Sequence, residues 1–166
     1  MKPAFVSESF SVPHLVEQES YRLRPLTTND VANDYEAVMS SRSSLRKIFS
    51  EYDKWPSDTM TLADNYRDLE RHQREFDERQ GFTYTVETPE GDKCLGCVYI
   101  YPTDKGDYEA QVFYWVTDIA KEAGLEEELG SFVRQWLKDV WPFKQVAYPG
   151  RDLSWQDWQA LAKRTE

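Results

Sequence analysis

The feature that most constrains the fold is a change of hydrophobic period after Gly81. Before it, apolar residues recur every three or four positions, which predicts helices. These helices cover about 31–40, 41–50 and 58–80. After it, apolar and polar residues alternate in three short segments, separated by turn sequences. We expect these segments, 82–86, 95–101 and 109–116, to be strands of an antiparallel meander.

A helix and a further strand follow the meander. Six apolar residues fall on one face of the segment from 125 to 140, and Trp141-Pro142 ends it. Residues 145–148 then read as a strand, which should run parallel to 109–116 because a helix connects them. The fold class is therefore α/β (α+β), with a mixed, mainly antiparallel sheet flanked by helices.

Polar residues at the helix starts complete this assignment. A first strand at 21–26 is followed by capping side chains in 27–30. The segment 55–58 breaks the pattern and is expected to cap the helix that follows it, and Ser154 is expected to cap a last helix. Residues 1–19 show no period and are interpreted as an N-terminal arm of a single domain, 1–166.

Composition narrows the classes of function. The formal net charge of −10 disfavours nucleic acid and anionic membranes as partners, whereas it is compatible with a cationic amine. No apolar run is long enough to span a bilayer, and Met1 to Val12 lacks the pattern of a signal peptide, so we expect a cytoplasmic protein. Most of the charge is interpreted as solvated surface.

The two cysteines, Cys94 and Cys97, are interpreted as buried strand residues. Positions three apart on a regular strand point to opposite faces, and further zinc ligands are not visible nearby. Neither a redox centre nor a metal site is expected. His72, at the edge of a helical stripe, and His14, in the arm, are interpreted as non-catalytic.

Several strings in this order resemble the GNAT N-acetyltransferases, in particular the branch of ribosomal-protein N-terminal acetyltransferases. Leu23-Arg24-Pro25-Leu26 with Asn29-Asp30 is similar to the family's opening strand and helix start. Leu95-Gly96-Cys97-Val98 and Phe113-Tyr114-Trp115-Val116 resemble its later strands. The resemblance covers about 21–150. It implies a GNAT-like fold and an enzyme that transfers an acetyl group from acetyl-CoA to an amine of a small molecule or peptide.

The resemblance also implies where the cofactor binds. The family's loop reads Gln or Arg, two residues, Gly, one residue, then Gly or Ala, and it holds the CoA pyrophosphate at a helix N-terminus. Lys121 takes the Gln/Arg position, Gly124 the first Gly position and Glu126 the second. The residues implied in cofactor binding are Trp115, Val116, Thr117, Lys121, Gly124, Leu125 and Glu126.

Two departures from the family leave the activity open. Glu126, Glu127 and Glu128 stabilise the helix start through its dipole but repel a pyrophosphate. The family's two last strands are missing after the helix at 155–161. One alternative is a catalytically inactive GNAT-like binding or regulatory protein. Another is an interaction module whose open sheet edge pairs with a second chain, as in a homodimer.

Two residues are candidates for the chemistry that the resemblance implies. Glu109, at the start of the strand before the loop, is the candidate base that deprotonates the amine. Tyr148, at the end of the strand after the main helix, is the candidate acid for the leaving thiolate. A solvated strand-edge acid and a core aromatic are the alternatives for these two, and Asp118 is a candidate cap for the loop.

Overall fold

The structure, a computed structural model, describes residues 4–165. Residues 1–3 of the expected arm and Glu166 lie outside the described residues. Six strands form one sheet in the order β1-β2-β3-β4-β5-β6. They span Val16–Glu17, Arg22–Pro25, Phe82–Glu87, Cys94–Pro102, Ala110–Val116 and Val146–Ala147. All neighbours are antiparallel except β5 and β6, which are parallel, so the expected mixed sheet is confirmed.

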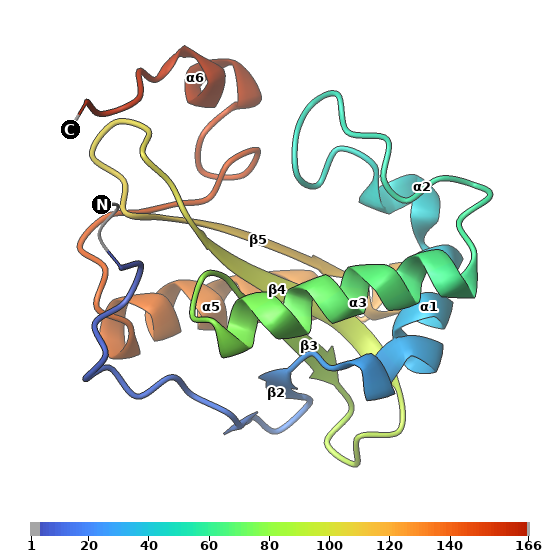
Figure 1. Ribbon diagram of the computed structural model, residues 1–166. Coiled ribbons are helices and arrows are strands. Elements are labelled where there is room, and N and C mark those ends of the chain that lie inside the picture. Colours follow the sequence, from blue (N-terminus) through green and yellow to red (C-terminus); the bar gives the residue numbers. More distant parts are fainter. Residues whose placement is uncertain (1–3, 166) are drawn as a thin grey trace.

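Helices cover both faces of this sheet (Figure 1). A short 3-10 helix at Thr28–Asp30 leads into α1, and α1 to α6 follow in chain order. They span Val31–Ser40, Arg42–Leu45, Leu62–Asp77, Asp118–Glu122, Leu125–Val140 and Trp155–Ala160. In Figure 1, α1 and α3 lie over one face and α5 lies over the other. No helix in the described residues is both long and apolar enough to cross a membrane.

Alternate side chains of β5 pack into two hydrophobic clusters, one on each face of the sheet. Val112, Tyr114 and Val116 pack with α5 on one side of the sheet. Phe113 and Trp115 pack on the side of α1 and α3. The expected arm joins the first cluster, because Val6 and Val12 are buried in it, and two arm carbonyls accept hydrogen bonds from the Arg79 guanidinium. The arm is therefore part of the packed structure.

Three local expectations are wrong. The helix at 41–50 ends at Leu45, since Arg46 is extended and Lys47 has a positive φ of 73°. The cap of α3 is Thr61 instead of the segment 55–58, and its side chain accepts the Asp64 amide at 3.1 Å. The loop after β5 contains the extra short helix α4. By contrast, the expected caps at Thr27 and Ser154 are confirmed.

The cysteines do not point to opposite faces. The register of β3 with β4 shifts between Val86 and Glu87, so that Val86 lies opposite Gly96 and Glu87 lies opposite Cys94. Leu95 is therefore an extra residue in β4, as in a β-bulge. The bulge turns Cys94 to the same face as Cys97, and both thiols are free and buried beside α1.

Candidate functional site

The outer edge of β5 is the centre of the candidate site. β5 pairs with β4 along its whole length, but it pairs with β6 only at Ala110 and Gln111. β6 ends at Ala147, and the two strands part there. Among residues 4–165, no strand covers this edge of β5 from Val112 to Val116. A ligand with amide groups can therefore bind the strand there.

Only some backbone groups of β5 face this edge. The Tyr114 carbonyl points to it and accepts a hydrogen bond of 2.8 Å from the Arg151 guanidinium. The Thr117 amide points the other way and donates to the Leu95 carbonyl at 2.9 Å. Because successive residues of a strand point their backbone groups to alternate sides, Val116 faces the open edge and Trp115 faces β4. Of the three strand residues implied in cofactor binding, Val116 is the one whose amide faces outward.

The loop after β5 is shaped by α4. Thr117 caps this helix, because its hydroxyl accepts the Ala120 amide at 3.2 Å. The adjacent residue, Asp118, is not the cap; its amide donates to the Ser41 hydroxyl at 2.8 Å, which ties the loop to the end of α1. The expected cap at Asp118 is therefore wrong by one residue.

Gly124 forms the entry to α5. It has a φ of 88°, a left-handed conformation that favours glycine, and a Cβ atom at this position would meet nothing within 4 Å. The next residues begin the helix, whose first amides have no acceptor within the helix. Leu125 is buried in the core and fixes the helix start against the sheet. The backbone at Gly124 is therefore surrounded by open space, while the buried side chain of Leu125 anchors the helix start to the core.

Glu126 does not fold back onto its own helix. One carboxylate oxygen lies 3.2 Å from the Arg151 guanidinium, and the other lies 3.7 Å from the Lys121 ammonium. The negative charge that opposes a phosphate is therefore shared between two cations. Both cations lie at the helix N-terminus, beside the open edge of β5.

Two arginines fill the space where β5 and β6 part. Arg151 stacks over the Tyr114 ring at 3.7 Å. Arg134 donates to the Tyr114 hydroxyl at 2.9 Å and binds the Asp152 carboxylate through two nitrogens, at 2.7 and 3.1 Å. The hydrogen bonds to Asp152 are the main reason that the pKa of Arg134 is raised. The sequence offers no signal for either arginine, because neither lies in a motif and their partners are far away in the chain.

The two candidate catalytic residues lie in different places. Tyr148 directly follows β6, and Arg134 lies 4.4 Å from its ring centre, so it borders the parting strands. Burial raises the pKa of Tyr148 and keeps its hydroxyl protonated. Glu109 precedes β5 at its other end, about 23 Å along the strand from the loop. Its carboxylate accepts the amides of Lys144, at 2.6 Å, and Gln145, at 3.4 Å.

A second feature lies on the opposite face of the sheet, between α3 and β4. It is a cavity of about 320 Å³ with aromatic walls and acidic groups. The walls include the rings of Phe49, Trp55, Tyr99 and Tyr101. The charged groups are Asp53, Asp68 and Arg71, and the Arg71 guanidinium lies 3.9 Å from the Asp68 carboxylate. The Phe49 ring also contacts Phe113 of β5, with 5.3 Å between ring centres, so the cavity adjoins the same strand.

His72 lines this cavity within a small network. Its Nδ1 atom lies 3.1 Å from the Thr83 hydroxyl and 3.0 Å from the Tyr101 hydroxyl. The Tyr101 hydroxyl also donates to Glu75 at 3.0 Å. His72 is therefore more buried and better connected than its place on a helical stripe indicated.

Comparisons with known proteins agree with this geometry. A ribosomal-protein-S5-alanine acetyltransferase from Vibrio fischeri has a similar structure, with a TM-score of 0.62 and 16% identity, covering 84% of this chain and 76% of that chain. RimL, a ribosomal L7/L12 α-N-protein acetyltransferase solved with coenzyme A, has a TM-score of 0.59 and 11% identity, covering 74% and 67%. The microcin C7 self-immunity acetyltransferase MccE, solved with acetyl-CoA and AMP, has a TM-score of 0.56 and 13% identity, covering 74% and 66%.

The chain spans 65% of the length of RimL in its apo crystal form. At these identities the likeness shows the fold. No curated protein sequence matches the chain. The family model for the acetyltransferase (GNAT) domain matches residues 21–150, which is most of the sequence and agrees with the resemblance of its strands. The chain therefore belongs to the GNAT acetyltransferase domain family.

Proposed function

We propose that this protein is an N-acetyltransferase that binds acetyl-CoA between the open edge of β5 and the N-terminus of α5. The acceptor is an amine of a small molecule or a peptide. The observation that carries the proposal is the parting of β5 and β6 after a pairing of only two residues. This arrangement leaves strand amides and a helix N-terminus side by side, which suits a ligand with amide and phosphate groups.

The residues of the loop fit the diphosphate of CoA in part. Lys121 and Arg151 supply positive charge, and the backbone at Gly124 leaves space for a phosphate. The amides of Leu125 and Glu126 would donate to it. The Glu126 carboxylate opposes it, although two cations offset this charge. The outward amide of Val116 would bind the acyl carbonyl.

Tyr148 is the proposed general acid. It borders the parting strands, and burial keeps a proton on its hydroxyl at neutral pH. Because burial raises its pKa, Tyr148 is a weaker acid than a free tyrosine, so the assignment rests on its position beside the parting strands. The assignment of Glu109 as base stays a prediction from sequence, since its carboxylate binds two backbone amides at the other end of β5.

The aromatic cavity beside α3 is the proposed acceptor site. Aromatic rings attract cations through their faces, and Asp53 adds negative charge, whereas Asp68 is paired with Arg71 in the same wall. The net charge of −10 favours the approach of a protonated amine. RimL acts on the N-terminus of ribosomal L7/L12, so N-terminal peptides of ribosomal proteins belong among the acceptors to test. We also propose a cytoplasmic location, because both cysteines are free thiols.

A second candidate function is that of an inactive GNAT-like binding protein. Two observations favour it. The Arg151 guanidinium already occupies the Tyr114 carbonyl, and Glu126 stands where the family keeps a small residue. Either contact weakens the binding of acetyl-CoA.

Calorimetric titration with acetyl-CoA separates these candidates. We expect Glu126→Gln to bind about tenfold more tightly than the natural chain, because it removes a charge that repels the phosphates. The matched control is Glu127→Gln, which changes an exposed carboxylate in the same helical turn and should alter the affinity by less than about twofold.

Turnover is measured as release of the CoA thiol with a panel of small amines and N-terminal peptides. Binding with turnover supports the transferase, and binding without turnover on any acceptor supports the inactive protein. If the natural chain and Glu126→Gln both fail to bind at millimolar acetyl-CoA, the use of this loop for CoA is excluded.

A further inference from the structure

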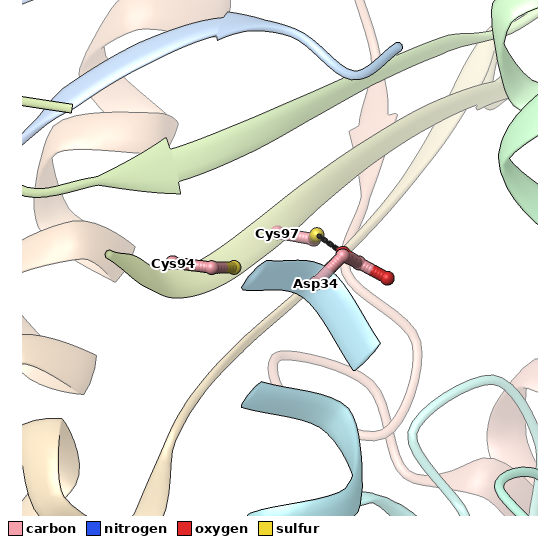
Figure 2. A group of neighbouring side chains, drawn as sticks. All are labelled: Asp34, Cys94 and Cys97. Atoms are coloured by element: carbon pink, nitrogen blue, oxygen red, sulfur yellow. Dashed lines mark hydrogen bonds between the residues drawn. The ribbon is translucent and has the colours of Figure 1, made fainter. Parts of the chain in front are cut away.

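A cluster of three buried side chains lies between α1 and β4, and Asn65 beside it also lines the proposed acceptor cavity. Asp34 belongs to α1, and Cys94 and Cys97 belong to β4 (Figure 2). One ligand atom from each residue lies within 4.8 Å of the other two. The cluster depends on the β-bulge at Leu95, because a regular strand would turn one thiol to the opposite face.

We propose that Asp34, Cys94 and Cys97 bind a zinc ion that joins α1 to β4. Two thiolates and one carboxylate are ligand types that zinc accepts, and thiolates select it over magnesium or calcium. Three protein ligands leave one position of a tetrahedron for a water molecule. Binding of one Zn²⁺ to the two thiols forms two zinc–sulfur bonds and releases two protons.

The distances suit this coordination. In a tetrahedral site with a Zn–S bond of about 2.3 Å and a Zn–O bond of about 2.0 Å, the sulfur and oxygen lie about 3.5 Å apart. The Cys97 sulfur lies 3.5 Å from one Asp34 oxygen, and this contact is the dashed line in Figure 2. The sulfur–sulfur separation in such a site is about 3.8 Å, so the Cys94 side chain has to move by about 1 Å at most.

A supporting partner orients the carboxylate. Asn65 of α3 is buried, and its side-chain amide donates to the other Asp34 oxygen at 2.9 Å. Such hydrogen bonds hold metal ligands in position in known sites. Among residues 4–165, no lysine or arginine forms an ion pair with Asp34. A bound zinc ion would give the buried carboxylate a positively charged partner, while the net charge of the cluster stays at −1 because the two thiols lose their protons.

An entry path leads to the cluster. A cavity of about 430 Å³ lies between α1, the start of β4, and the helices α4 and α5. Cys94 is part of its wall, together with Glu36 and Lys93. A metal ion can therefore approach the cluster from the side of Cys94, which is its one member in this wall.

The first test uses the natural chain, reduced and stripped of metal. We expect titration of zinc against a chromophoric chelator to show one ion per chain with a dissociation constant below about 1 µM. Cobalt should bind with the near-ultraviolet charge-transfer absorption of a thiolate–cobalt bond. Zinc binding should also release about two protons per chain, measured in weakly buffered solution.

Variants then locate the site. We expect Cys94→Ser and Cys97→Ser to lower the zinc affinity by about a hundredfold or more, and Asp34→Asn by about tenfold or more. The matched control is Asp92→Asn, an exposed aspartate two residues before Cys94, and His14→Gln controls for binding to a surface imidazole. Both controls should leave the affinity unchanged.

Three results overturn the proposal, and none depends on a variant that folds. The first is fewer than about 0.1 zinc ions per reduced natural chain at micromolar zinc. The second is cobalt binding without the thiolate charge-transfer band. The third is zinc binding that releases no protons in weakly buffered solution, because ligation by two thiolates releases two.

Discussion

Glu75 shows how a single hydrogen-bonded group links α3 to β4. The His72 imidazole lies 3.5 Å from its carboxylate, and the Tyr101 hydroxyl donates to it at 3.0 Å. The hydrogen bond with His72 is the main cause that holds the pKa of Glu75 below its ordinary value, and the bond from Tyr101 adds to it. The charged form of Glu75 therefore stabilises the wall of the aromatic cavity.

This contact predicts a pH dependence of stability. The pKa of Glu75 is lower in the folded chain than in the unfolded chain, where it is about 4.3. Its contribution is therefore fully present above that value and is lost as the pH falls through the folded pKa. We expect the difference in free energy of unfolding between the natural chain and Glu75→Gln to be constant from pH 6 to about pH 5 and to shrink below that.

Urea denaturation between pH 3 and pH 7 measures this difference. Glu70→Gln, an exposed position on the same helix, is the matched control and should show a smaller change across the range. A Glu75→Gln difference that grows as the pH falls would contradict the assigned direction of the shift.

At the scale of elements, β4 and β5 approach each other closely at Gly96. A Cβ atom at Gly96 would lie 2.1 Å from the Trp115 carbonyl oxygen. That oxygen belongs to the backbone of the neighbouring strand and cannot turn aside. Gly96 is therefore required by the close approach of the two strands, one residue after the bulge at Leu95.

Two glycine substitutions separate crowding from backbone conformation. We expect Gly96→Ala to lower the free energy of unfolding by about 2–4 kcal/mol, because the strands must part. Gly124→Ala meets no atom within 4 Å and should cost only about 1–2 kcal/mol, for the left-handed φ. Thermal and urea unfolding of both variants checks the order, and equal costs would show that steric crowding at Gly96 is not decisive.

Periodicity predicted most elements well. The alternation in 82–86, 95–101 and 109–116 and the apolar face of 125–140 gave strands and a helix close to their observed bounds. These segments pack on the core over their full length, so burial fixes their pattern in the sequence. The short β1 and α4 were missed, because two to five residues hold too little of a period.

The candidate site was less predictable than the fold. The loop residues Lys121, Gly124 and Glu126 could be placed from the resemblance of the strand before them. The partner of Glu126 could not, because Arg151 reaches it from a loop 25 residues later. The bulge at Leu95 also escaped prediction, since one extra residue in a strand leaves the apolar pattern almost unchanged while it reverses a side chain.

At the scale of the whole molecule, the sheet ends in two very short edges. Within residues 4–165, the outermost strands are β1 and β6, and each has two residues. Short edge strands offer few backbone groups to another chain. Pairing through β1 or β6, one form of the edge pairing that the sequence left open, would therefore gain little stability. The longer open edge of β5, from Val112 to Val116, is partly occupied by Arg151, which binds the Tyr114 carbonyl.

We accordingly predict that the protein stays monomeric at micromolar concentration. Size-exclusion chromatography with light scattering should give the mass of one chain across a tenfold range of concentration, with and without acetyl-CoA. A dimer that persists on dilution would contradict the argument from edge length.

The Arg151 side chain is placed where it would compete with the proposed cofactor. Its guanidinium contacts the Tyr114 carbonyl, the Tyr114 ring and the Glu126 carboxylate at the same time. In the proposed site, acetyl-CoA would therefore have to displace this side chain. If the Arg151 side chain has moved out of this position in only about 1% of molecules, the apparent affinity for acetyl-CoA falls about a hundredfold below the intrinsic affinity. Under the proposed function, the position of this one side chain would then set the concentration of acetyl-CoA at which the site is half occupied.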